Sequence, residues 1–211
     1  MISRSVRLYL TSYSILLLIT LVPLIIYSQD ELFLLLNNWH FKFLDSFFYW
    51  LTYLGDGIVF ALIIVVLLFF SYRQAVLGLV IFLVTAGLAQ LLKRVIFSDV
   101  LRPVANLGKE YVLAIPEGVT PLMNNSFPSG HTTTAFALSF FLLVSFHDKI
   151  NWLLMLILAL LVGYSRVYMT HHYPIDVWAG SIIGTIGAFF LYYWLDPWLN
   201  KKFSNRSILN R

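Results

Sequence analysis

Chemically reactive side chains are concentrated in three short segments, each at the edge of an apolar run. The first, residues 165–176, ends one apolar run and opens the next, and it carries an arginine, two histidines and an aspartate. The second is Pro128-Ser129-Gly130-His131, and the third covers residues 93–103. Charged side chains at the margin of a membrane span are energetically expensive and mark function. We therefore predict one site, able to handle a phosphate anion, built from all three segments.

The elements that position these segments are predicted to be membrane-spanning helices. Of the 211 residues, 60% are hydrophobic and only 11% are charged, against roughly 25% charged in soluble proteins. A helix that crosses the hydrocarbon needs roughly 20 mainly apolar residues. Runs without charged residues cover 8–29, 57–72, 74–92, 118–146, 150–165 and 177–195. We expect an all-α integral membrane fold with six transmembrane helices, in a single domain over residues 1–211.

Residues 31–54 show a different pattern. Polar side chains recur at helical spacing on one face, at Asn38, Lys42, Asp45, Tyr49 and Thr52. Large apolar side chains fall on the other face, at Leu36, Phe43, Phe47, Trp50 and Leu54. This pattern is typical of an amphipathic helix that lies in the interface of the membrane. The competing interpretation is an extension of the transmembrane helix that follows.

The charge distribution favours membrane topology over nucleic-acid binding. The net charge is +4, but the basic residues lie between apolar runs and at the tail instead of along one face. Six spans put both termini on one side, with eight Lys and Arg against six on the other. Without the candidate site cations Lys93, Arg102 and Arg166, the count becomes eight against three. The positive-inside rule then predicts cytoplasmic termini and an active site on the opposite face.

The same topology brings the three segments together at one depth. Lys93 ends the third predicted span and His131 begins the fourth, while Arg166 ends the fifth and Asp176 begins the sixth. Ser129 and Gly130 lead into a helix start, where unpaired N–H groups favour an anion. Guanidinium groups add planar donors that suit phosphate oxygens.

These motifs resemble those of the type 2 phosphatidic acid phosphatase superfamily. The second family motif stands here as Pro128-Ser129-Gly130-His131, and the third fits Ser165, Arg166, His172 and Asp176 without a gap. The first motif, Lys followed after six residues by Arg-Pro, is irregular. Arg102-Pro103 is present, but eight residues separate Lys93 from Arg102 and seven separate Arg94 from it. The resemblance covers roughly residues 55–195.

The resemblance implies a role for each site residue. His172 would be the nucleophile, Asp176 would orient it, and His131 would protonate the leaving group and then activate water. The phosphate oxygens would be held by Arg102, Arg166, Ser129, the Gly130 amide and either Lys93 or Arg94. Lys93 and Arg94 lie roughly 100° apart on a helix, so that only one is expected to face the site, and we favour Lys93.

The function implied is an integral membrane phosphatase that hydrolyses a lipid phosphate monoester or diphosphate through a phosphohistidine. No cofactor or metal is expected: a metal site built from the two histidines and the carboxylate is the rival, but the adjacent cations would repel a divalent ion. A phosphotransferase that passes the phosphate to another lipid and a non-catalytic lipid-phosphate transporter both stay open. We expect His40 and His171, which match no motif, in the interfacial aromatic layer.

The expected partners are a lipid phosphate and the bilayer, with no nucleic acid. The expected location is a bacterial cytoplasmic membrane, crossed several times. The sequence does not choose among phosphatidylglycerol phosphate, undecaprenyl diphosphate, lipid A and phosphatidic acid, and it does not indicate the oligomeric state.

Overall fold

Helices account for all regular secondary structure in residues 2–146, 149–203 and 206–209, which are the residues that this computed structural model describes. Six of the helices are long: α1 (Arg4–Ile26), α4 (Gly57–Phe70), α5 (Tyr72–Leu91), α7 (Gly130–Phe146), α8 (Trp152–Tyr168) and α9 (Pro174–Phe203). They correspond one for one to the six long helices predicted from the sequence. The all-α prediction is therefore confirmed for the described residues.

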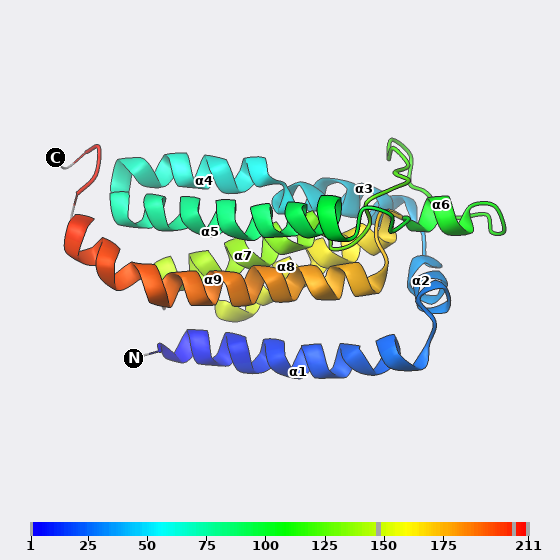
Figure 1. Ribbon diagram of the computed structural model, residues 1–211, viewed down its shortest axis with the longest axis horizontal. Helices are drawn as coiled ribbons and strands as arrows, with labels where there is room; N and C mark the ends of the chain where they lie inside the picture. Colours follow the sequence, from blue (N-terminus) through cyan, green and yellow to red (C-terminus); the bar gives the residue numbers. More distant parts are fainter. Residues whose placement is uncertain (1, 147–148, 204–205, 210–211) are drawn as a thin grey trace.

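The short elements gather at one end of the bundle. The described chain begins and ends at the opposite end (Figure 1). Three short helices lie toward the far end, α2 (Gln29–Asn37), α3 (Lys42–Leu51) and α6 (Pro103–Leu107). A 3₁₀ turn, η1 (Thr52–Gly55), leads from α3 toward α4, and a π turn, η2 (Leu92–Ile96), continues α5. The connection between η2 and α7 contains α6.

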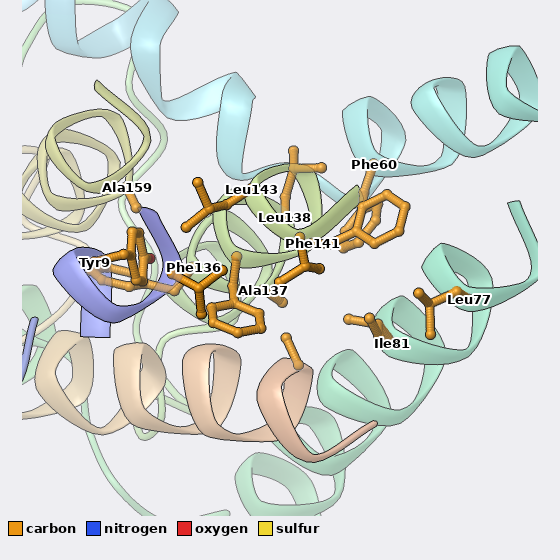
Figure 2. Packing of buried hydrophobic residues seen from close by; sticks show 14 of the residues in the cluster. Tyr9, Phe60, Leu77, Ile81, Phe136, Ala137, Leu138, Phe141, Leu143 and Ala159 are labelled. Carbon is orange, nitrogen blue, oxygen red and sulfur yellow. The ribbon is translucent and has the colours of Figure 1, made fainter. Parts of the chain in front are cut away.

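Helix α7 forms the centre of the bundle. Its residues are buried without a break from Thr132 to Phe141. Figure 2 shows Phe136, Ala137, Leu138, Phe141 and Leu143 of α7 surrounded by Tyr9 of α1, Phe60 of α4, Leu77 and Ile81 of α5, and Ala159 of α8. The Phe141 ring lies 5.6 Å from that of Phe60, and the Phe140 ring lies 6.0 Å from that of Tyr9. Because α7 opens with Gly130-His131, the packing of five helices fixes the position of the second motif.

Glycines allow α9 to approach α7 closely. A Cβ atom on Gly180 would lie 2.6 Å from the Ser129 carbonyl oxygen. A Cβ on Gly184 would overlap the Thr133 carbonyl oxygen and lie 3.0 Å from the Ala137 nitrogen. Small residues of this kind are the usual means by which helices pack tightly inside a membrane. The contact sets the distance between the two helix starts that carry His131 and Asp176.

The outer surface of the bundle is apolar, as expected for contact with hydrocarbon. Within the described residues, three helices are long and apolar enough to cross a membrane: Arg4–Ile26, Tyr72–Ile96 and Pro174–Phe203. A fourth is added if Lys42–Gly55 and Gly57–Phe70, which meet at an angle of 51°, are counted as one broken span. Helices α7 and α8 have 17 residues each, fewer than the roughly 20 that a straight span needs. The count of six spans therefore stays a prediction.

The prediction that residues 31–54 form one continuous amphipathic helix is wrong. The segment forms two helices, α2 and α3, separated at residues 38–41. The cause is Asn37, whose buried amide donates to the carbonyl oxygens of Val167 and Tyr168 at 2.9 and 3.0 Å. This contact pins the end of α2 to the end of α8, and the chain must turn before it can follow the bundle again.

The predicted faces of α3 do appear in the structure. Phe43 and Trp50 are exposed, 77% and 70%. On the polar side, Asp45 accepts a hydrogen bond of 2.6 Å from the Tyr168 hydroxyl, and Thr52 accepts one of 2.6 Å from Arg166. Two residues of the predicted polar face, Asp45 and Thr52, therefore contact the end of α8, and the large apolar residues Phe43 and Trp50 point outward.

We predict that Gly184→Ala destabilises the protein, because its methyl group has no room beside the α7 backbone. The melting temperature in detergent should fall by several degrees, as expected for overpacking of about 1–3 kcal/mol. Gly87→Ala in α5 is the matched control, since nothing lies within 4 Å of a Cβ there. The control should melt at or above the wild-type temperature, because alanine favours a helix over glycine. Equal melting of both variants would contradict the close contact between α7 and α9.

Candidate active site

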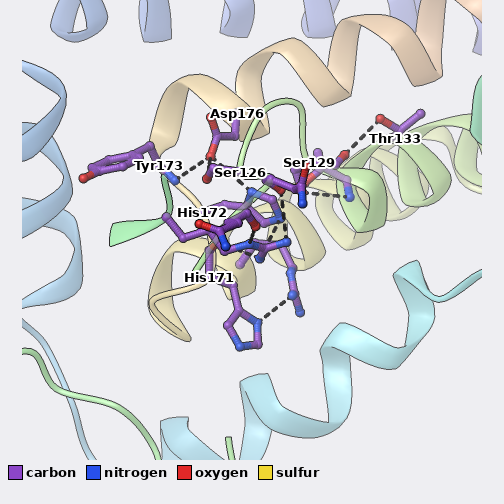
Figure 3. Close-up of polar contacts among 12 residues, drawn as sticks. Ser126, Ser129, Thr133, His171, His172, Tyr173 and Asp176 are labelled. Atoms are coloured by element: carbon purple, nitrogen blue, oxygen red, sulfur yellow. Dashed lines mark hydrogen bonds and ion pairs between the residues drawn. The ribbon is translucent and has the colours of Figure 1, made fainter. Parts of the chain in front are cut away.

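His172 and Asp176 form a buried pair at the start of α9. His172 Nδ1 lies 3.1 Å from Asp176 Oδ2, and the side chains are 2% and 1% exposed. The same carboxylate oxygen accepts hydrogen bonds from Ser126 Oγ at 2.5 Å and from the Tyr173 N–H at 3.0 Å (Figure 3). Because the carboxylate accepts, Nδ1 of His172 carries the proton, and Nε2 keeps its lone pair. The arrangement prepares Nε2 to act as a nucleophile.

An unusual backbone conformation comes directly before the two neighbouring histidines. Thr170 has a φ of 60°, which is a true outlier for a β-branched residue. Its hydroxyl donates to the Ala114 carbonyl oxygen at 2.9 Å, and the His171 and His172 N–H groups both donate to the Arg166 carbonyl oxygen. In Figure 3 the His172 side chain lies toward Asp176, and the His171 ring points away from it.

Arg102 is held against the nucleophile by backbone carbonyl groups. Its Nε donates to the Asn124 carbonyl at 2.8 Å, and its Nη1 donates to the His171 carbonyl at 2.9 Å. Nη1 also lies 3.5 Å from His172 Nε2. The side chain is only 8% exposed. Burial lowers the pKa of the Arg102 guanidinium from its ordinary value.

Arg166 is more deeply buried and incompletely paired. Its Nη1 donates to Thr52 Oγ1 and its Nη2 to His171 Nδ1, both at 2.6 Å. Its Nε is buried and has no hydrogen-bond partner among the described residues. An unpaired donor on a buried cation costs free energy, and a bound anion would satisfy it.

The start of α7 offers backbone donors. Ser129 caps the helix: its Oγ accepts from the Thr132 hydroxyl at 2.9 Å, and its carbonyl accepts from the Thr133 N–H at 3.0 Å. The Ser129 N–H is itself bonded to the Asp176 carbonyl at 3.0 Å. The first N–H groups of a helix favour an anion, so the Gly130 and His131 amides are the donors available here.

A cavity of about 490 Å³ collects these groups. It is lined by Lys93, Arg94, Arg102, Gly130, His131, Arg166 and His172, together with Gly55, Asp56, Gly57, Phe82, Ala86, Gln90, Leu122, Asn124, Asn125 and Thr134. Six of the eight predicted site residues therefore share one continuous space. Asp176 lies behind His172, and the Ser129 hydroxyl is occupied by Thr132, outside the lining. The role of Ser129 as a phosphate ligand stays a prediction.

Both residues of the irregular first motif line the cavity, contrary to the expectation that only one could face it. Lys93 is buried, and Arg94 is exposed. Both lie in the π turn Leu92–Ile96. A π turn contains more residues per turn than an α-helix, so neighbouring side chains are separated by a smaller angle. The turn thus accommodates part of the extra length that separates this motif from the regular spacing.

We expected His171 in the interfacial aromatic layer, and this expectation is wrong. The residue is buried beside Arg166, at the edge of the site. It is 9% exposed, and its Nε2–H donates to the Thr120 carbonyl at 3.1 Å while its Nδ1 accepts from Arg166. Burial and the Arg166 cation lower the pKa of His171 to about 4. Burial, followed by the Arg102 cation, lowers the pKa of His172 well below its ordinary value. Both rings are neutral at neutral pH. His40, by contrast, stacks on Tyr168 with 4.2 Å between ring centroids.

A second group of residues, which the sequence did not predict, holds the turn between His172 and Asp176. Asn106 of α6 donates to the Tyr173 hydroxyl at 3.0 Å and to Asp30 of α2 at 3.2 Å. The Tyr173 N–H in turn donates to Asp176. Neither Asn106 nor Ser126 has a spacing rule that links it to Asp176, so no signal in a single sequence could have placed them.

Comparisons with known proteins identify a family and several relatives of the chain. A family model described as the PAP2 superfamily matches residues 75–199, more than half of the chain. The bacitracin transport permease protein BcrC of Bacillus licheniformis is 45% identical over 78 residues, which cover 37% of this chain and 37% of that protein. The chain thus aligns with little more than a third of that relative's length.

Two longer matches cover most of the chain. An undecaprenyl-diphosphatase of Sulfolobus acidocaldarius is 32% identical over 157 residues, which cover 74% of this chain and 72% of that protein. The crystal structure of Aquifex aeolicus LpxE has a TM-score of 0.68 at 30% identity, over 77% of this chain and 93% of that one. The fold described above is therefore similar to that of a solved protein over most of the described bundle.

The lowered pKa of His171 predicts a loss of stability in acid. In the unfolded chain this histidine titrates near 6.5, and in the folded protein near 4, so the unfolded state binds more protons between these values. The contribution of neutral His171 to the free energy of unfolding is then complete above pH 6.5, and it is lost as the pH falls toward 4. The melting temperature of His171→Asn, which keeps an acceptor for Arg166 but does not titrate, should fall less over this range than that of the wild type. Identical pH dependence of the two proteins would show that His171 is not buried as a neutral ring.

Proposed function

The chain belongs to the PAP2 superfamily, and on that premise we propose that it is a membrane phosphatase that hydrolyses a lipid phosphate through a phosphohistidine. The observation that carries the proposal is the shared cavity. Its lining includes His172, Arg102, Arg166 and Lys93 together with Gly130 and His131 at the start of α7, and His172 Nε2 lies 3.5 Å from Arg102 Nη1. An oriented nucleophile surrounded by cations and helix-start amides is what phosphoryl transfer requires.

The proposed reaction has two steps. In the first, His172 Nε2 attacks phosphorus, and the bond between phosphorus and the leaving oxygen breaks, while His131 donates a proton to that oxygen. In the second, His131 takes a proton from water, the resulting hydroxide attacks phosphorus, and the phosphorus–nitrogen bond breaks to release inorganic phosphate. Covalent catalysis divides one difficult displacement into two easier ones, and a histidine acid or base contributes roughly 10²–10⁴-fold.

We also propose that no metal ion takes part. In this proposal Lys93, Arg102 and Arg166 neutralise the phosphate oxygens, a role that a metal ion would otherwise have. In the described ranges, no group of three or more His, Asp or Glu side chains has the arrangement of a metal site. The chemistry of the lining side chains supports cationic stabilisation over Lewis-acid stabilisation.

A lipid substrate is supported by the shape of the cavity. Phe82, Ala86 and Gln90 line it from successive turns of α5, so it extends about 12 Å along that helix, away from the polar end. A headgroup bound near His172 would leave its tail in this direction, beside a predicted membrane span. Exposing each CH₂ of a tail to water costs about 0.8 kcal/mol, which favours entry from within the bilayer. The name of the relative from Sulfolobus, an undecaprenyl-diphosphatase, agrees with a lipid substrate.

The proposed topology has six spans, α1, α4, α5, α7, α8 and α9, with cytoplasmic termini in a bacterial cytoplasmic membrane and the active site on the other face. It is supported by the charge count and by the position of both ends of the described chain at the end of the bundle far from the site (Figure 1).

Two alternatives to hydrolysis are phosphotransfer and transport. A phosphotransferase would use the same first step and pass the phosphate from His172 to a second lipid. A transporter is suggested by the name of the relative from Bacillus licheniformis, but transport requires no nucleophile. The ordered pair His172–Asp176 therefore favours an enzyme.

We predict that His172→Ala abolishes phosphate release and leaves the protein folded and able to bind orthovanadate. Acid-quenched wild-type enzyme incubated with ³²P-labelled lipid phosphate should carry an acid-labile label that the variant lacks. Both measurements should be insensitive to EDTA. The control is His40→Ala, a histidine that does not line the cavity, which should retain both turnover and label. Normal turnover by His172→Ala would overturn the mechanism, and EDTA inhibition reversed by one divalent ion would favour the metal site instead.

The topology is tested by single cysteines, because the sequence has no native cysteine. Glu110→Cys lies in the loop at the active-site end, and Lys201→Cys lies near the end of α9; both positions are exposed. On intact cells, a membrane-impermeant thiol reagent should label Glu110→Cys, and it should label Lys201→Cys only after the membrane is permeabilised. The reverse pattern would place the active site in the cytoplasm.

A further inference from the structure

Arg94 is a cation of the cavity that the reaction described above does not use. It lines the same space as Lys93, but it is exposed, whereas Lys93, Arg102 and Arg166 are 7%, 8% and 4% exposed. Within the described part of the chain, Arg94 makes no hydrogen bond and no ion pair. Its five N–H donors are therefore available at the mouth of the cavity.

The π turn is what directs Arg94 to this position. Its neighbours Leu91, Val95 and Ile96 are exposed apolar residues, 54%, 68% and 60%, and form the outer face of this end of α5. In that setting a guanidinium that pointed outward would be placed against hydrocarbon, at a high cost. Instead Arg94 lines the cavity, and Gln90, one turn earlier on α5, lines it too.

Further polar groups lie around the same opening. Asn124 and Asn125 also line the cavity, and Arg102 is bonded to their backbone carbonyl groups, which leaves their side-chain amides for other partners. The Gln90 amide lies 3.7 Å from the position of a Cβ on Gly130, beside the start of α7. On the wall at the start of α4, Asp56 caps its helix by accepting from the Ile58 N–H at 3.1 Å. A negative group entering the mouth would be repelled from Asp56 and attracted toward Arg94.

We propose that Arg94, with Gln90 and the two asparagine amides, forms a second phosphate subsite, so that the substrate is a lipid diphosphate. This inference rests on the proposed function, because it assigns the terminal phosphate to His172, Arg102, Arg166 and Lys93. The phosphate attached to the lipid then lies one bridging oxygen further out, at the exposed cation. A monophosphate would leave Arg94 without an anion.

The assignment has a chemical consequence. His172 Nε2 bonds to the terminal phosphorus, and the bond from that phosphorus to the bridging oxygen breaks. The electron pair stays on the bridging oxygen, which now belongs to a lipid monophosphate and accepts the His131 proton. Water then releases one inorganic phosphate from His172. Negative charge increases on the departing monophosphate, and Arg94 stabilises that charge more in the transition state than in the ground state.

The test compares two pairs of lipids in detergent micelles: a polyprenyl diphosphate and monophosphate of equal chain length, and diacylglycerol diphosphate and phosphatidic acid with the same acyl chains. Within each pair the tail is constant, so the ratio of kcat/KM isolates the second phosphate. The wild type should prefer the diphosphate and yield lipid monophosphate and inorganic phosphate in equal amounts. Arg94→Gln should reduce the ratio about tenfold, the size of one charge-assisted contact, and Arg94→Lys should restore part of it.

Lys109→Gln is the matched control, because Lys109 is an exposed cation at the same end of the molecule and does not line the cavity. Its ratio should equal that of the wild type. The subsite is refuted if the wild type hydrolyses the monophosphates at least as well, or if Arg94→Gln leaves the ratio of kcat/KM unchanged. In both cases hydrolysis that depends on His172 would still support the proposed phosphatase. Absence of phosphate release from all four lipids would overturn the phosphatase itself.

Discussion

The structure depends on how positive charge is stabilised at one end of an apolar bundle. Lys93, Arg102 and Arg166 are buried there, and the one buried carboxylate beside them among the described residues, Asp176, is engaged with His172. A buried cation without compensation costs several kcal/mol. The protein compensates with neutral acceptors, which are the carbonyl groups of Asn124, Asn125 and His171, the Thr52 hydroxyl and the His171 ring. These acceptors hold the guanidinium groups in place but do not cancel their charge. In the proposed function, the remaining positive potential attracts the phosphate.

That arrangement requires a rigid scaffold, because cations that could move apart would do so. The scaffold is α7, buried over most of its length and contacted by α1, α4, α5, α8 and α9. Gly180 and Gly184 bring the start of α9 against it, and Asn37 ties α2 to the end of α8. Each helix end that carries a site residue is therefore fixed by contacts outside the site. The donors are in position before any substrate binds, which is the condition for electrostatic catalysis.

The sequence predicted the parts of this structure that obey local rules. The six long helices follow from apolar runs, and the placement of His131, Arg166, His172 and Asp176 at helix ends follows from where those runs stop. The parts that were missed depend on contacts between distant residues. His171 differs from His172 by one position, and it contacts Arg166 directly after the left-handed residue Thr170. Ser126 donates to Asp176, and Asn106 donates to the hydroxyl of Tyr173 from a separate element. The break between α2 and α3 is caused by a hydrogen bond to the end of α8.

The π turn at the end of α5 has a consequence for how such a site can diversify. An ordinary helix that gains a residue rotates everything beyond the insertion by about 100°, which would remove Arg102 from its place. A π turn confines the additional residue to a single turn and leaves the flanking segments in register. New side chains can therefore enter the cavity by insertion while the other groups that line it keep their positions. An insertion in this turn can therefore change which substrates fit the cavity, whereas a change of the reaction itself requires substitution of the residues that carry it.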